Sequence, residues 1–178
     1  MPTLRTPSRG FSLLEALVVV AVIGILMAAA GPELYRLINK SRVMTAVDCS
    51  AILLRKARLR AVKYNVLGSV EMEVSGGQRK LTGNADRKLK SECTLPEQIQ
   101  TWGVTGFDNL DRPEPAGMAL FRGDGSAVEA GAFQFNDVRG NSLRVAIDPA
   151  ATGRVQITKL EGATWHRADE GKRPWIWQ

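Results

Sequence analysis

An almost unbroken hydrophobic block near the N-terminus constrains this chain more than any other feature. From Phe11 to Gly31 the sequence reads FSLLEALVVVAVIGILMAAAG, and only one serine and one glutamate, Glu15, interrupt its apolar character. As an α-helix these residues rise about 31 Å, which is enough to cross a hydrocarbon core of roughly 30 Å. Residues 1–10 before the block contain arginine and no acidic residue. This asymmetry predicts a cytoplasmic N-terminus and an exported C-terminal part.

Three interpretations of the block are open. An ordinary secretory signal would be cleaved after Ala30, where small residues end the block. An uncleaved block would act as a simple anchor. In the third interpretation the chain is cleaved in front of the block, at Gly10-Phe11. Glu15 favours the third, because a carboxylate in an apolar helix is costly unless it has a partner, such as the α-amino group of a neighbouring helix. A charge tolerated near the membrane edge is the simpler alternative.

The string RGFSLLE at residues 9–15 resembles the class III signal of type IV pilins and pseudopilins. The apolar tract that follows, together with Pro32, resembles the curved first helix of that family. In such proteins the prepilin peptidase cuts after the glycine and methylates the new N-terminal residue. The resemblance implies cleavage between Gly10 and Phe11, N-methylation of Phe11, and a role for Glu15 in setting the register between neighbouring subunits.

Beyond Pro32, which should kink the first helix or locally melt it, residues 32–65 again have a helical pattern. At 100° per residue one apolar stripe should lie on a globular domain: Val43, Val47, Leu54, Ala57 and Ala61. Ile52 and Leu59 fall near the opposite side, among basic residues. They predict a second contact surface that faces neighbouring helices, or they are two exposed aliphatic side chains of no further consequence.

After residue 65 the pattern changes to the alternation of β-strands. Residues 83–95 are charged and predict a loop, residues 108–115 predict a surface connection, and the tail 161–178 predicts either a cover for the sheet or an exposed contact. The expected strands are 66–74, 78–82, 97–104, 118–122, 132–136, 142–148 and 153–160. The expected fold is α+β, with the long helix packed on a mostly antiparallel sheet.

This pattern divides the chain into four parts. They are a leader (1–10), a membrane-spanning and filament-core helix (11–31), an amphipathic second half of the helix (32–65) and an exposed β-rich domain (66–178). The chain has one histidine, His166, and no spacing typical of metal ligands, so neither a metal site, a cofactor nor an enzymatic activity is predicted. Cys49 and Cys93 either pair in an oxidising compartment or remain two buried thiols.

Three further stretches resemble the GspH/FimT-type minor pilins and pseudopilins. They are LLRKARLRAVKYNV at 53–66, LFRGDGSA at 120–127 and GRVQI at 153–157. The resemblance implies a low-abundance subunit that primes or caps a type IV pilus or a type II secretion pseudopilus. The implied partners are other pilins through the N-terminal helix, the prepilin peptidase, the inner-membrane assembly platform and a tip adhesin.

The net charge of +6 is compatible with nucleic acid, an anionic membrane or an acidic partner. Some relatives used for DNA uptake carry a Gly-Arg-x-Arg motif; here Gly153-Arg154 is followed by Val155-Gln156, so the second arginine is absent. A pilus-associated DNA receptor and a secreted binding domain remain alternatives. Solvated loop charge explains the other basic residues more simply than a DNA contact does: Arg79, Lys80, Arg87, Lys88 and Lys90.

Overall fold

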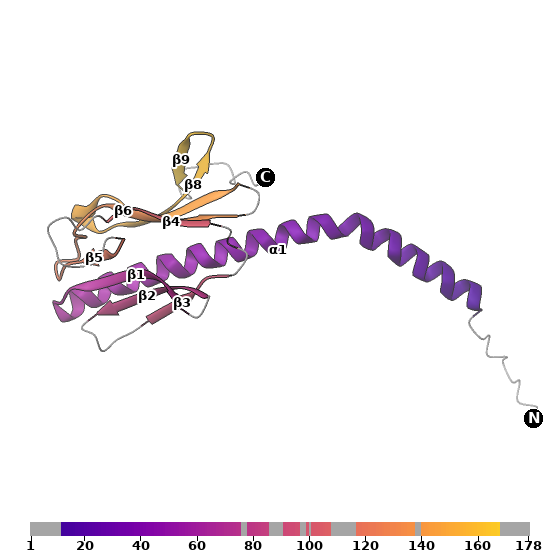
Figure 1. The fold of residues 1–178 in the computed structure, drawn as a ribbon, viewed down its shortest axis with the longest axis horizontal. Coiled ribbons are helices and arrows are strands. Elements are labelled where there is room, and N and C mark those ends of the chain that lie inside the picture. Colours follow the sequence, from indigo (N-terminus) through magenta and orange to yellow (C-terminus); the bar gives the residue numbers. More distant parts are fainter. Residues whose placement is uncertain are drawn as a thin grey trace, which may run out of the picture. The chain divides into compact units, whose positions relative to one another are not determined.

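The computed structural model describes residues 12–75, 78–85, 91–96, 99, 101–107, 117–137 and 140–167. The chain divides into two compact units, Met1–Ile38 and Asn39–Gln178, and each is described by itself. Helix α1 (Leu13–Tyr64) contributes to both units, and the described strands all belong to the second (Figure 1). One long N-terminal helix packed against antiparallel sheets is the expected α+β fold.

Helix α1 starts immediately after Ser12, whose hydroxyl oxygen accepts a hydrogen bond from the amide of Glu15 at 3.2 Å. A serine followed three residues later by glutamate is a capping-box sequence, so the start of the helix is encoded locally. The helix continues without interruption through Pro32. Of the two expectations for Pro32, local melting is wrong, because proline removes one amide donor while the hydrogen bonds on either side keep the segment helical. The kink at Pro32 stays a prediction.

Two antiparallel sheets replace the single sheet that the sequence suggested. The first has the order β3-β2-β1-β5 and the second the order β4-β6-β7-β8-β9. The strands of the first sheet are β1 (Gly68–Ser75), β2 (Gln78–Ala85), β3 (Ser91–Thr94) and β5 (Ala119–Phe121). Those of the second are β4 (Thr101–Gly106), β6 (Gly131–Asn136), β7 (Ser142–Ile147), β8 (Val155–Glu161) and β9 (Thr164–Arg167), with a short 3-10 helix, η1 (Ala150–Thr152), before β8.

The strand predictions are confirmed in outline and wrong in two places. Residues 83–95 are not simply a loop, because β2 runs to Ala85 and β3 begins at Ser91. β3 is an edge strand, where exposed charge such as that of Glu92 is tolerated and even useful, so a charged composition misled the prediction. In addition, the tail contributes β9, which pairs with β8.

One hydrophobic core joins α1 to both sheets within the second unit. The predicted stripe on α1 is confirmed as buried at all five positions, from Val43 to Ala61. Phe133 and Phe135 of β6 and Leu81 of β2 belong to the same cluster. The alternation of buried and less buried residues along β6 and β7 leaves the second sheet with an inner face in the core and an outer face away from it.

Candidate assembly surface

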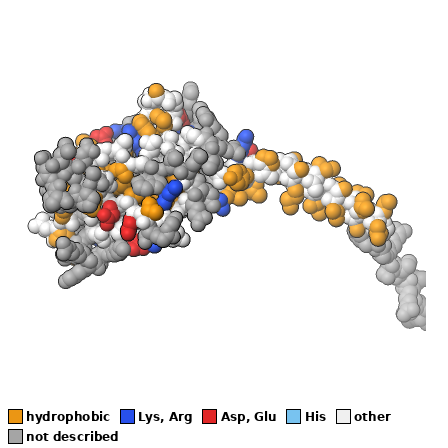
Figure 2. Space-filling model, viewed as in Figure 1, with side chains coloured by type: hydrophobic (Ala, Val, Ile, Leu, Met, Phe, Trp, Pro, Cys, Tyr) orange, Lys and Arg blue, Asp and Glu red, His pale blue; other side chains and the backbone are white. Residues whose placement is uncertain are grey.

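The N-terminal half of α1 is an apolar helix with no cover inside its own unit. Among the described residues α1 is the one helix that is long and apolar enough to cross a membrane, and its most apolar 18-residue window has a mean hydropathy of 2.7 with none of it buried. Figure 2 shows hydrophobic side chains along this helix. Exposed contiguous apolar surface of this kind marks a membrane or protein contact.

The exposed apolar surface is longer than a membrane requires. It begins at Leu13, which is 84% exposed, and large exposed hydrophobic side chains continue to Ile38, the last residue of the first unit. A helix over this range rises about 39 Å, against a hydrocarbon core of roughly 30 Å. Leu34, Tyr35 and Leu37 are exposed beyond Pro32, beside the surface ion pair of Arg36 and Glu33 at 3.4 Å. Lipid alone would therefore leave several of these side chains in water.

Glu15 lies in the first turn of α1 and forms no ion pair with any residue that the structure describes. Its position has a local explanation, because a carboxylate at the N-terminus of a helix interacts favourably with the helix dipole. The predicted register role requires a positive group on another chain. Gly10 and Phe11, the predicted processing site, lie outside the described residues.

A second exposed apolar strip lies on α1 within the second unit, away from its core-facing side. Ile52 is 60% exposed, Leu59 is 68% exposed and Val62 is also exposed. Arg55, Lys56 and Lys63 surround these side chains on the exposed side of the helix, whereas Arg60 is half-buried and donates a hydrogen bond to Ser91 at 3.0 Å. The exposure of Ile52 and Leu59 is confirmed, and their contact with neighbouring helices stays a prediction.

Cys49 and Cys93 form a disulfide in the structure, with Cα atoms 6.1 Å apart. The bond links α1 to the edge strand β3, and the two cysteines are 44 residues apart in the chain. Closing a loop of this length restricts the unfolded chain and stabilises the folded one by about 2–4 kcal/mol. The disulfide thus fixes the outer edge of the first sheet to the helix.

The structure brings together three sequence stretches that lie far apart in the chain. Arg58 of α1 donates a hydrogen bond from Nε to the carbonyl oxygen of Gly125 at 2.8 Å. Gly153, just before β8, has φ +58° and lies so close that an added Cβ would meet the Gly125 carbonyl oxygen. These residues come from the stretches 53–66, 120–127 and 153–157, so the fold brings parts of all three stretches into contact. Neither hydrophobic periodicity nor spacing could have revealed that contact.

The basic residues considered as DNA contacts differ in their partners and in their exposure. Arg79 donates a hydrogen bond from Nη1 to the carbonyl of Ile99, and Lys80 lies 3.9 Å from Glu92 in a cross-strand ion pair. Arg154 is exposed beside Gly153. Arg87 and Lys88, like Lys90, lie outside the described residues. Two of the proposed contacts therefore already have partners within the protein.

Residues 5–31 match the family model described as the prokaryotic N-terminal methylation motif. The match contains the predicted processing site, Glu15 and most of the apolar half of α1. A search of curated proteins and a search of solved structures found no match. Among the described residues no group of three or more His, Cys, Asp or Glu side chains is placed to hold a metal ion. The motif, the exposed apolar helix and the α+β fold together support a type IV pilin-like protein.

Proposed function

We propose that this protein is a minor pilin or pseudopilin, a structural subunit that primes or caps the assembly of a type IV pilus or a type II secretion pseudopilus. The observation that supports this most directly is the uncovered apolar surface of α1 from Leu13 to Ile38. Because that surface is about 9 Å longer than a bilayer core, it fits a helix whose outer turns pack against other helices.

The four parts of the chain follow from this proposal. Residues 1–10 are a leader removed by the prepilin peptidase, residues 11–31 anchor the subunit in the inner membrane and then in the filament core, and residues 32–65 connect the anchor to the exposed domain 66–178. The cytoplasmic N-terminus and periplasmic domain place Cys49 and Cys93 in an oxidising compartment, which is consistent with the disulfide.

The proposal of a minor subunit, as opposed to the bulk pilin, rests on the resemblance of three sequence stretches to GspH/FimT-type subunits. Parts of these stretches meet in the fold at Arg58, Gly125 and Gly153. A priming subunit should be rare in sheared filaments, and its loss should reduce the number of filaments more than their length. Equal amounts of this protein and the main pilin in purified filaments would contradict the priming role.

Processing is tested by the intact mass and N-terminal residue of the protein extracted from membranes. A mature chain that starts at Phe11 and is heavier by one methyl group supports the pilin proposal. A chain that starts at Gly31 in the soluble fraction contradicts it and favours the secreted binding domain. A Gly10→Ala variant should accumulate as the unprocessed precursor, whereas a Ser8→Ala variant, two residues away, should be processed normally.

The DNA receptor is less well supported, because Arg79 and Lys80 are engaged within the protein. A salt-dependent shift of double-stranded DNA by the full chain in detergent would favour it. The absence of a shift at low salt would remove it without affecting the filament proposal.

A further inference from the structure

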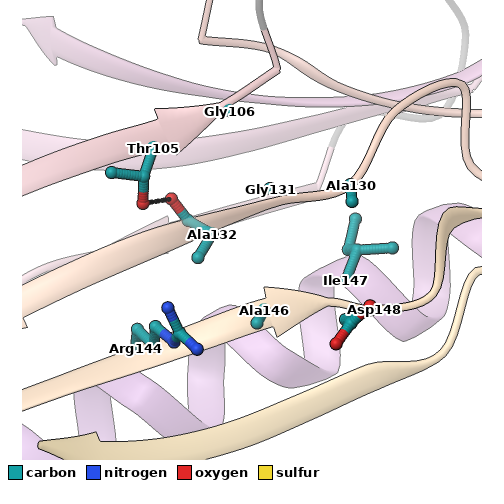
Figure 3. A pocket seen from close by; sticks show the side chains of 9 residues that line it. All are labelled: Thr105, Gly106, Ala130, Gly131, Ala132, Arg144, Ala146, Ile147 and Asp148. Carbon is teal, nitrogen blue, oxygen red and sulfur yellow. Dashed lines mark hydrogen bonds between the residues drawn. The ribbon is translucent and has the colours of Figure 1, made fainter. Parts of the chain in front are cut away.

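A shallow groove of about 300 Å³ crosses the outer face of the second sheet (Figure 3). Thr105, Ala132 and Ala146 lie next to one another across β4, β6 and β7, as the strand register requires. They form a narrow floor of small side chains on the face opposite the core. The groove is lined by these three residues and by Gly106, Ala130, Gly131, Arg144, Ile147 and Asp148.

Opposite charges flank this floor, one on β7 and the other immediately after it. Arg144 and Asp148 lie two residues before and two residues after Ala146, so all three point to the same face. Figure 3 shows the guanidinium of Arg144 and the carboxylate of Asp148 at separate places along the groove, with Ala146 between them. Their Cα atoms are roughly 13 Å apart at the usual rise of a strand. Each charge is therefore accessible to a different part of one extended ligand.

Arg144 is held in place by two neighbours. Its Nε donates a hydrogen bond to the hydroxyl of Thr158 at 2.9 Å, and its guanidinium carbon lies 4.3 Å from the centre of the Trp165 ring. Burial lowers the pKa of Arg144, and the charge of Asp148 partly offsets that effect. Within the part of the chain that the structure describes, the two terminal amino groups have no hydrogen-bond acceptor. A partly desolvated guanidinium that Thr158 and Trp165 hold in one orientation presents a planar donor fork, which matches the geometry of a carboxylate.

We propose that this groove binds an extended segment of another protein that carries one carboxylate, and that this carboxylate binds Arg144. The small side chains of Ala132 and Ala146 and the backbone of Gly131 allow a polypeptide to approach the sheet closely. The carboxylate of Asp148 repels a second negative charge on the ligand, so the site disfavours phosphate. The same carboxylate can accept a hydrogen bond from a basic or amide group further along the segment. The net charge of +6 favours an acidic partner at longer range. This proposal does not depend on the filament role.

The test uses the full chain in detergent micelles and the capped peptide acetyl-Ala-Ala-Glu-Ala-Ala-Lys-amide, observed by NMR at the Arg144 Nε–H and the Trp165 indole. The expected result is saturable binding that is at least tenfold tighter than that of the same peptide with Gln in place of Glu. The Arg144→Gln variant should lose this preference. Ala146→Leu should abolish binding by filling the groove while Arg144 is kept. Arg55→Gln, which removes the same charge from an exposed position on α1, should bind like the unchanged protein.

Four results would overturn the proposal. They are an absence of saturable binding, an equal loss of binding in Arg55→Gln and Arg144→Gln, binding of acetate as tight as that of the peptide, and binding of inorganic phosphate tighter than that of the peptide. The second would reveal an effect of net charge alone, and the last two would reveal a site for small anions. Peptide binding that requires removal of residues 168–178 would identify the chain's own C-terminal segment as the occupant, and it would also contradict the proposal.

Discussion

Leu54 and Leu59 provide a matched pair that separates folding from assembly. Both are leucines of α1 in the second unit, and their exposed fractions are 0% and 68%. Replacing Leu54 with Ala removes a side chain from the core shared with both sheets and leaves a cavity, which costs about 2–5 kcal/mol. Replacing Leu59 with Ala removes exposed surface and should change the free energy of unfolding by less than about 0.5 kcal/mol. Helix propensity does not confound the comparison, since alanine favours a helix at least as much as leucine.

Thermal unfolding of the full chain in detergent, followed by near-ultraviolet circular dichroism, measures this difference. For a unit of this size 1 kcal/mol corresponds to roughly 4 °C in Tm. Leu54→Ala should therefore lower Tm by about 8–20 °C and Leu59→Ala by no more than about 2 °C. In cells, Leu59→Ala should retain normal protein levels and be incorporated less efficiently into filaments. Similar Tm values for the two variants would refute the assignment of the two faces of α1.

Three other substitutions test separate contacts. Glu15→Gln keeps the helix start and removes the charge, so it should impair co-assembly, measured by filament yield. Ser12→Ala weakens only the helix cap, by about 1 kcal/mol, and should leave the filament yield unchanged. Equal defects in the two variants would show that capping is the main role of both residues. Gly153→Ala should cost about 2 kcal/mol or more in denaturant unfolding, because φ is +58° and Gly125 occupies the space, whereas Gly103→Ala, with nothing within 4 Å, should be neutral or slightly stabilising. The hydrogen bonds from Ser126 lower the pKa of Asp124 below its usual value, so the stability it contributes is present above about pH 4 and is lost as the pH falls through the folded-state pKa. Asp124→Asn should therefore flatten the pH dependence of Tm below about pH 4. An unchanged decrease of Tm in acid would contradict this.

The sequence by itself determined the features that depend on local order. The almost unbroken hydrophobicity from Phe11 to Gly31 predicted a long apolar helix, the spacing of Gly10 and Glu15 predicted the motif that the family model matches, and period 3.6 predicted the buried stripe of α1. Alternation identified most strands, because a strand with one face in a core must alternate. These properties are written in neighbouring residues and need no knowledge of the rest of the fold.

Only the tertiary structure decided which distant residues meet. The separation of the strands into two sheets, the place of β3 at an edge, and the joining of Cys49 to Cys93 all depend on pairings between residues far apart in the chain. The contact of Arg58 with Gly125 and the groove that ends at Arg144 are of the same kind. An arginine in a charged stretch has the same local pattern whether it is solvated or held by Thr158 and Trp165. A solvated arginine and a held one differ in burial and in hydrogen-bond partners, which are properties of the packed chain. Sequence periodicity predicts only which face of a helix or strand carries each side chain.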